Sequence, residues 1–194
     1  MIIERPFALF LGIVILIPLL IVSIKKKRPT GRKILLILCV MYISLVAAIT
    51  IFPIIADPEI MVFTDKTINL QPFSTISELL HDNSDTETVV LQLIGNIVMC
   101  IPFGVSLPFI IVHKHKFLYI LDAVLFPIII EAVQLLISFI YNSYYRTIDI
   151  DDVILNFSGV LVGYLIYLLL PKFVKEFFSY TGKKSDCNNA VKSS

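Results

Sequence analysis

The sequence predicts an all-α integral membrane protein, a bundle of five transmembrane helices with its N-terminus outside and its C-terminus in the cytoplasm. Hydrophobic residues make up 57% of the chain and charged residues only 16%, and the mean hydropathy is +0.89. These values lie outside the usual range of soluble domains. Because backbone groups in lipid must pair within their own segment, each span is expected to be helical.

Five apolar stretches are long enough to cross a bilayer, which takes roughly 20 apolar residues per helix. They are Pro6–Ile24, Ile34–Ile55, Val89–Val112, Phe117–Tyr141 and Val153–Pro171. We expect the first to be retained rather than cleaved as a signal peptide, because Glu4 precedes it, no A-x-A site follows, and the basic run comes after it. A single transmembrane domain is therefore predicted over residues 1–175, with a polar, disordered cytoplasmic tail over 176–194.

The Lys and Arg residues predict the orientation. Six of the sixteen lie between the first two spans, two lie in the turn after the third span and five lie in the tail. Only Arg5, Lys66 and Arg146 remain for the other side. Cytoplasmic loops carry an excess of basic residues, so these loops and the tail are assigned to the cytoplasm. The net charge of +1 gives no indication of nucleic-acid binding.

The cysteines and histidines do not indicate a metal or a cofactor. Cys39 and Cys100 lie inside spans and Cys187 lies in the tail, so no external pair exists for a disulfide. His113 and His115 stand among lysines in a short turn, where we expect a solvated loop. The sequence therefore predicts no metal site and no cofactor.

A polar stripe opens the fifth span. If the chain becomes helical near Asp149, then Asp149, Asp152, Asn156, Gly159 and Gly163 recur at i, i+3, i+7, i+10 and i+14 and share one face. The two glycines form a small-xxx-small pair, which lets another helix approach closely. The stripe is therefore expected to face protein rather than lipid.

A plainer interpretation makes these aspartates a helix cap that complements the helix dipole. Asp151 lies about 160° from Asp149 around the helix and points away from the stripe. We expect it to contribute no more than a capping or dipole effect of about 0.3–1 kcal/mol. Capping does not account for Asn156, one turn deeper in the span.

Glu131 lies near the middle of the fourth span, about 15 Å from its outer end. A carboxylate at that depth costs about 3 kcal/mol unless it is paired or protonated, and so indicates function. A second polar stripe continues from it toward Arg146, formed by Gln134, Ser138 and Asn142. We expect Glu131 and Gln134 to lie within reach of Asn156 or Asp152.

Other polar positions in the spans admit structural interpretations. Asn96 follows Gln92 at i+4 in the third span, and either amide alone is explained by hydrogen bonding between helices. Asp122 is close enough to the cytoplasmic end to reach water, and it is assigned no role. Pro102 removes a backbone donor and Gly104 loosens the same turn, so we expect a kink there that frees the carbonyl of Val98.

A short helix is predicted outside the membrane between the second and third spans. Pro72 indicates a turn, and Thr75 with Glu78 forms a T-x-x-E capping box ahead of apolar residues. Such a segment is typical of an interfacial helix at the headgroup level. It could cover the polar cluster as a lid or be an ordinary surface element.

Taken together, these residues resemble the VanZ-like family of small polytopic membrane proteins over about residues 35–170. The resemblance is carried in order by Asn69, Leu70, Pro72, Phe73, Asn96, Pro102, Phe103, Gly104, Glu131, Gln134, Arg146, Asp149, Asp152, Asn156, Gly159 and Gly163. The interval from Gln134 to Arg146 is longer and richer in tyrosine than the family pattern. The resemblance implies a link to resistance against the glycopeptide teicoplanin, which acts on cell-wall precursors outside the membrane.

Three functions remain open at this point. Arg146 suits a bidentate grip on phosphate or carboxylate, which favours a non-enzymatic protein that binds membrane lipids, a lipid-linked wall precursor or a glycopeptide. Glu131 would tend to hold a proton in low dielectric, so an enzyme on a lipid-linked substrate is an alternative, with Glu131, Arg146 and Asp152 as candidate catalytic residues. Asn96, Gln134, Asp149 and Asn156 are the candidate binding residues. A small transporter is the third hypothesis, motivated by an interrupted third span.

Overall fold

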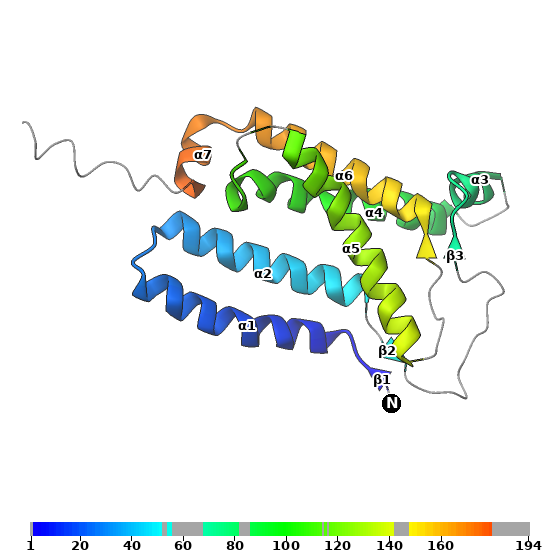
Figure 1. Ribbon diagram of the computed structural model, residues 1–194, viewed down its shortest axis with the longest axis horizontal. Helices are drawn as coiled ribbons and strands as arrows, with labels where there is room; N and C mark the ends of the chain where they lie inside the picture. The colour runs from blue at the N-terminus through cyan, green and yellow to red at the C-terminus, as the bar shows by residue number, and fades with distance from the viewer. Residues whose placement is uncertain are drawn as a thin grey trace, which may run out of the picture.

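The computed structural model describes residues 2–51, 54–55, 68–81, 86–113, 115, 117–141 and 148–179. Five long helices dominate it (Figure 1), and each is long and apolar enough to cross a membrane. They are α1 (Pro6–Lys25), α2 (Thr30–Thr50), α4 (Thr86–Ile110), α5 (Phe117–Tyr141) and α6 (Ile150–Leu169). Two short helices, α3 (Ser74–His81) and α7 (Lys172–Phe178), lie at opposite ends of the bundle. The predicted all-α membrane bundle of five spans is confirmed.

The helix limits match the predicted span for α5 and differ by one to five residues for the other four long helices. The second span was predicted to run to Ile55, but α2 ends at Thr50. Pro53 follows in the sequence, and a proline disfavours helix at the residue before it. The fifth span was predicted from Val153, and α6 begins three residues earlier. The tail was predicted from residue 176, but α7 continues through Phe178; residues 180–194 lie outside the described residues.

Four two-residue strands, which the sequence did not predict, join the loops in the described part of the chain. β1 (Ile2–Ile3) pairs antiparallel with β2 (Ile54–Ile55). β3 (Ile68–Asn69) pairs in parallel with β4 (Ile148–Asp149), with Asn69 opposite Asp149. The second pair places the loop before α3 directly against the start of α6.

The closest helix packing is between α4 and α6. A Cβ atom added to Gly159 would lie 2.1 Å from the carbonyl oxygen of Ile97, and one added to Gly163 would lie 2.1 Å from that of Ile101. Gly104 on α4 meets the carbonyl oxygen of Val160 at the same distance. Glycine is required at all three positions because the contacting atoms are backbone, so the two helices touch along their main chains. The small-xxx-small face of α6 is thus the face that lies on α4.

α5 crosses the bundle diagonally and links two helix pairs (Figure 1). Its first half packs against α4 and α6, where Ala123 joins a buried cluster and the rings of Phe126 and Phe103 stack 3.7 Å apart. Its second half reaches the α1–α2 pair, where Ile137 packs on Ala8 and Ala48. α5 is therefore one connection between the two pairs, beside the hydrogen bonds that Arg32 and Tyr42 on α2 donate to carbonyl oxygens of α4.

α4 is helical without interruption through Pro102 and Pro108. The hydroxyl of Tyr42 on α2 donates to the carbonyl oxygen of Met99 at 3.0 Å, in the turn before Pro102. A side chain from a neighbouring helix therefore satisfies part of the backbone beside the proline. The kink expected at Pro102 and the role of the Val98 carbonyl stay predictions.

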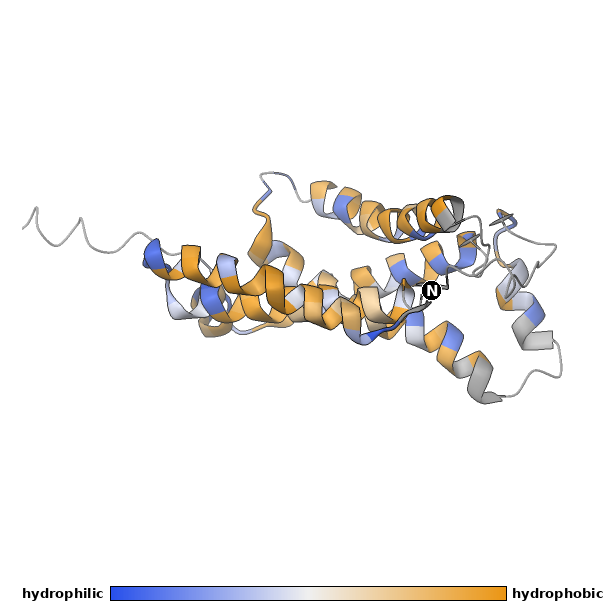
Figure 2. Ribbon diagram, turned by 90° about the horizontal axis from the view of Figure 1, so that it is seen from below, coloured by the Kyte–Doolittle hydropathy of each residue, from blue (hydrophilic) through white to orange (hydrophobic). Residues whose placement is uncertain are grey.

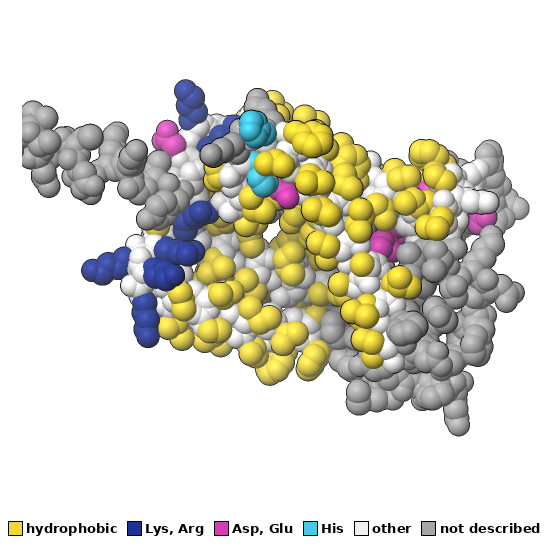
Figure 3. Space-filling view, in the orientation of Figure 1, with side chains coloured by type: hydrophobic (Ala, Val, Ile, Leu, Met, Phe, Trp, Pro, Cys, Tyr) yellow, Lys and Arg dark blue, Asp and Glu magenta, His cyan; other side chains and the backbone are white. Residues whose placement is uncertain are grey.

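The spans consist mostly of apolar residues, many of them exposed, and polar residues are more frequent toward the ends (Figure 2). Figure 3 shows the Lys and Arg side chains gathered at one end of the bundle, around the α1–α2 turn and α7. The loops to which the sequence assigned most basic residues therefore lie together, as an alternating span order requires. Which side of the membrane this end faces stays a prediction.

Cysteine labelling on intact cells checks that orientation. Lys26 and Ser77 are exposed at the two ends of the bundle. In a background without Cys39, Cys100 and Cys187, we expect an impermeant maleimide to label Ser77→Cys directly and Lys26→Cys only after permeabilisation. The reverse pattern would invert the predicted topology.

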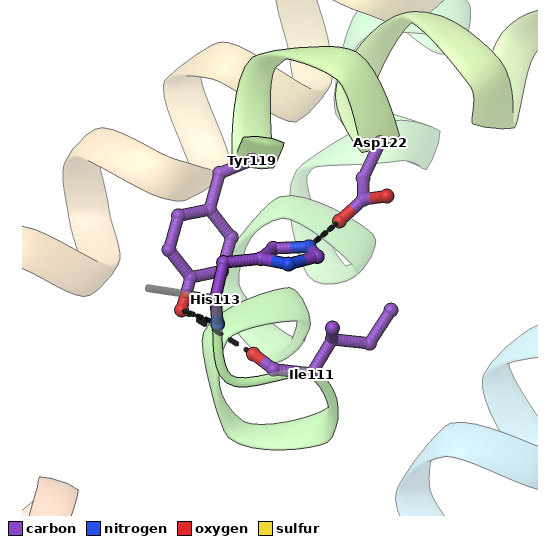
Figure 4. A network of polar contacts seen from close by, with 4 residues as sticks. All are labelled: Ile111, His113, Tyr119 and Asp122. Atoms are coloured by element: carbon purple, nitrogen blue, oxygen red, sulfur yellow. Dashed lines mark hydrogen bonds and ion pairs between the residues drawn. The ribbon is translucent and has the colours of Figure 1, made fainter. Parts of the chain in front are cut away.

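A polar network ties α4 to α5 at the basic end (Figure 4). His113 Nε2 lies 2.5 Å from Asp122 Oδ2. The hydroxyl of Tyr119 accepts from the amide of His113 at 3.2 Å and donates to the carbonyl oxygen of Ile111 at 3.3 Å. His113 lies in the loop after α4, as expected, but its side chain is paired with Asp122, a partner that the sequence did not predict.

Candidate functional site

The start of α6 is built around Asp149. This residue has extended backbone angles, and its Oδ1 accepts from the amide of Asp151 at 3.0 Å, which makes it the N-cap of the helix. The hydroxyl of Thr75 donates to Oδ2 of Asp149. The amide of Asn69 lies 3.4 and 3.5 Å from the two carboxylate oxygens. Asp149 is therefore both a cap and an attachment point for the loop before α3.

Asn69 organises that loop from within. Its Nδ2 donates to the hydroxyl oxygens of Ser74 at 2.7 Å and Thr75 at 3.0 Å, and its Oδ1 accepts from the amide of Gln71 at 3.2 Å. These bonds hold the first turn of α3 beside Asp149. The sequence quoted Asn69 only as part of a resemblance, and its side-chain role was not predicted.

Asp151 has a larger role than the sequence suggested. It is only 1% exposed, and its carboxylate accepts from the amides of Phe73 at 2.5 Å, Thr75 at 3.0 Å and Ile76 at 3.1 Å. These are amides at the N-terminus of α3, which lack partners within their own helix. The helical phase placed Asp151 correctly off the glycine face, but the conclusion that it is a minor cap was wrong, because α3 lies against it.

The Asp151 carboxylate also takes the place of the capping box that was predicted for α3. The helix begins at Ser74, not after Thr75, and the acceptor at its N-terminus is Asp151 from α6. Phe73, just before the helix, has a φ of 66°, which is uncommon for a residue with a side chain. A charged acceptor from another helix is a stronger partner than a Thr hydroxyl, so it determines where α3 starts.

Asp152 and Asn156 lie on the face of α6 that meets α4. Asn96 Nδ2 donates to Asp152 Oδ1 at 2.6 Å, and one turn deeper the thiol of Cys100 lies 3.3 Å from Asn156 Oδ1. Asn156 is 2% exposed and Cys100 is fully buried. The sequence did not predict Cys100 as a partner, although its i+4 spacing from Asn96 places it on the same face of α4.

The two polar residues in the middle of α5 are buried, with Glu131 7% and Gln134 8% exposed. Gln134 Nε2 donates to the carbonyl oxygen of Thr50 at 2.6 Å, at the C-terminus of α2, where the helix leaves its last carbonyls without internal partners. Gln134 thus contacts α2 instead of the expected Asn156 or Asp152. Glu131 shares its face of α5 at i−3, and its reach to α6 stays a prediction.

Some predicted site residues fall outside the described part of the chain. They are Arg146, Asn142 and the side chain of Ser138. Among the residues that the structure does describe, no group of three or more His, Cys, Asp or Glu side chains could hold a metal ion. The arrangement that remains consists of three neighbouring aspartates at the start of α6, each with protein partners, and a buried carboxyl on α5.

This geometry can position groups at the membrane border. Three elements, α3, β4 and the N-terminus of α6, are held together by carboxylates that accept from amides and a hydroxyl. Carboxylates at a helix N-terminus are favoured by the helix dipole. Asp149 and Asp151 therefore hold the loop before α3 against the start of α6.

Comparison with protein families gives one match, to the VanZ/LLP1 model over residues 34–171. Among curated proteins and among solved structures, no significant match was found. The matched segment runs from the second turn of α2 to just past the end of α6 and contains every residue of the site described above. Since it covers well over half of the chain, the protein belongs to the VanZ/LLP1 family.

Proposed function

We propose that this membrane protein acts at the outer face of the cell membrane by binding the headgroups of anionic lipids or lipid-linked cell-wall precursors, and that it thereby lowers susceptibility to teicoplanin. The observation that supports the proposal is the contact between Asp151 on α6 and the start of α3, called here the α6–α3 clamp. The buried carboxylate of Asp151 accepts hydrogen bonds from three backbone amides of a segment outside the spans. A binding site needs such fixed supports, since loosely held groups lose affinity.

The partnered aspartates do not themselves attract an anion. In the proposal that task belongs to Arg146, two residues before β4, whose guanidinium suits phosphate and carboxylate. Asn96 adds an amide beneath the clamp, where it donates to Asp152. The predicted partners are membrane lipids or a wall precursor. Both carry phosphate groups, which Arg146 and Asn96 would bind.

An enzyme acting on a lipid-linked substrate is a second candidate, favoured by the burial of Glu131 in the middle of α5. An intramembrane carboxyl is a functional hypothesis by default, and it would serve as acid or base there. The small transporter stays a third hypothesis, with α4 helical from Thr86 to Ile110 and the kink expected at Pro102 as its motivation.

Substitution at the α4–α6 contact tests the proposed function. In a teicoplanin-sensitive host, we expect expression of the wild-type chain to raise the minimal inhibitory concentration. Asp152→Asn should reduce it to the empty-vector level, because it removes the charge that Asn96 contacts without changing side-chain size. Arg146→Lys should do the same, because lysine lacks the planar fork. The protein level in membranes is measured in parallel.

Asp122→Asn is the matched control, since it removes an aspartate charge at the opposite end of the bundle. It should keep the wild-type inhibitory concentration. A wild-type chain that gives no protection at normal membrane levels would overturn the link to teicoplanin. Lipid extracts from the same cells distinguish the candidates, because a modified lipid species that disappears with Glu131→Gln would indicate the enzyme.

A further inference from the structure

The basic end of the bundle carries a dense group of exposed cations. Lys25 ends α1, Lys26, Lys27 and Arg28 follow it in the turn before α2, and all four are exposed. Figure 3 shows Lys and Arg side chains gathered at this end of the bundle. All five long helices begin or end at this level, so these side chains lie at the border of the spans. Lys172 adds an exposed ammonium at the start of α7.

The backbone of the turn has a conformation that favours glycine at Lys27. Its φ is 49°, in the left-handed region. The amide of Lys27 donates to the carbonyl oxygen of Ile24 at 2.9 Å, and that of Arg28 donates to Ser23 at 3.1 Å. This is the Schellman pattern of a helix C-terminus, in which the left-handed position is usually glycine. A lysine at this position is less stable than glycine would be, but it keeps a positive charge in the turn.

Next to this turn, α7 is fixed to the end of the bundle. A Cβ atom added to Gly31 would lie 1.8 Å from the carbonyl oxygen of Phe177, so α7 lies directly against the first turn of α2. The ring of Phe178 packs on that of Phe109 at 5.6 Å. The position of α7 relative to the lysines is therefore defined by packing.

α7 also carries two exposed aromatic side chains. Phe173 is 72% exposed and Phe177 is 50% exposed, and at i and i+4 they share one face. Short helices with exposed aromatic residues beside lysines are typical of segments that lie in the membrane interface.

The acidic groups at this end are few among the described residues, and one of them is already engaged. Asp122 is held by His113, and Glu176 lies on α7. The surface around the turn is therefore strongly positive, and its charge is complementary to phosphate.

We propose that the basic end is a binding surface for anionic phospholipids of the leaflet that it faces. The ammonium groups of the α1–α2 turn contact lipid phosphates, and Phe173 and Phe177 enter the boundary between headgroups and acyl chains. This surface lies at the opposite end of the bundle from the α6–α3 clamp.

Lipid selection by the purified full-length protein tests the proposal. The protein is incubated in detergent with equal amounts of phosphatidylglycerol and phosphatidylcholine of the same acyl chains, and the retained lipid is measured by mass spectrometry. We expect enrichment of phosphatidylglycerol. Lys27→Gly should reduce this enrichment about fivefold, as expected for one basic residue near an anionic surface. The triple variant Lys25→Gln, Lys26→Gln, Lys27→Gly should lower it further, to the enrichment that the proposed site at the other end of the bundle contributes.

Lys27→Gly is informative because glycine suits its backbone, so its thermal stability should equal or exceed that of the wild type. Arg5→Gln, which removes an exposed charge at the other end, is the matched control and should leave the enrichment unchanged. Phe173→Ser should weaken the retention of both lipids. Unchanged enrichment in the triple variant would overturn the proposal. So would complete displacement of the lipid by inorganic phosphate, because the ligand would then be a soluble anion.

Discussion

Gly163→Ala is expected to lower the free energy of unfolding by about 2 kcal/mol. The added methyl group would lie 2.1 Å from the carbonyl oxygen of Ile101 and 2.9 Å from backbone atoms of Gly104 and Val105. Overpacking costs about 1–3 kcal/mol, and the upper part of that range applies because backbone atoms cannot rotate away. The gain in helix propensity, up to about 1 kcal/mol, offsets part of this cost. Unfolding in mixed micelles with increasing denaturing detergent measures the difference.

Gly95→Ala provides the matched control on α4. A Cβ atom at this position meets no heavy atom within 4 Å. The same chemical change should therefore leave stability unchanged or raise it by up to about 1 kcal/mol. Equal destabilisation by both substitutions would show that the effect is general to glycine in these helices and does not arise from the α4–α6 contact.

Asp151→Asn is expected to loosen α3 from the bundle. An amide group offers one acceptor oxygen where the carboxylate uses two, so at least one of the bonds from Phe73, Thr75 and Ile76 is lost. A hydrogen bond to a charged group contributes about 1.5–3 kcal/mol. Hydrogen exchange at these three amides should therefore become about tenfold to hundredfold faster.

Asp122→Asn, at the opposite end, should leave this exchange unchanged and serves as the control. Resistance to teicoplanin should also fall with Asp151→Asn if the clamp supports the proposed site. Wild-type exchange rates in Asp151→Asn would mean that α3 is held by other contacts and that the three amide bonds add nothing to its position.

The sequence was sufficient to predict the spans and the faces of the helices, but not which elements meet those faces. Hydropathy identifies the spans because lipid leaves little choice of structure. The spacing of Gly159 and Gly163 indicates a close helix contact because it depends on one helix alone. The phase of Asp151 was also correct, yet its partner comes from a loop more than seventy residues earlier, which no local pattern reveals.

Gln134 is a second residue whose partner could not be predicted from the local sequence. Its burial followed from the polar stripe on the fourth span, but the sequence does not show that α5 crosses toward the end of α2. The carbonyl of Thr50 is available to Gln134 there because α2 ends before Pro53, five residues earlier than predicted. The position at which α2 ends therefore determines the partner of Gln134.

The diagonal course of α5 has a consequence for biogenesis. α1 and α2 are consecutive and can pair as a hairpin as soon as both have entered the membrane. α4 packs most closely on α6, which is synthesised only after α5. During that interval Asn96 and Cys100 have not yet met Asp152 and Asn156. Until then the polar side chains of α4 face the translocation machinery or lipid without their partners. Insertion of α6 supplies those partners.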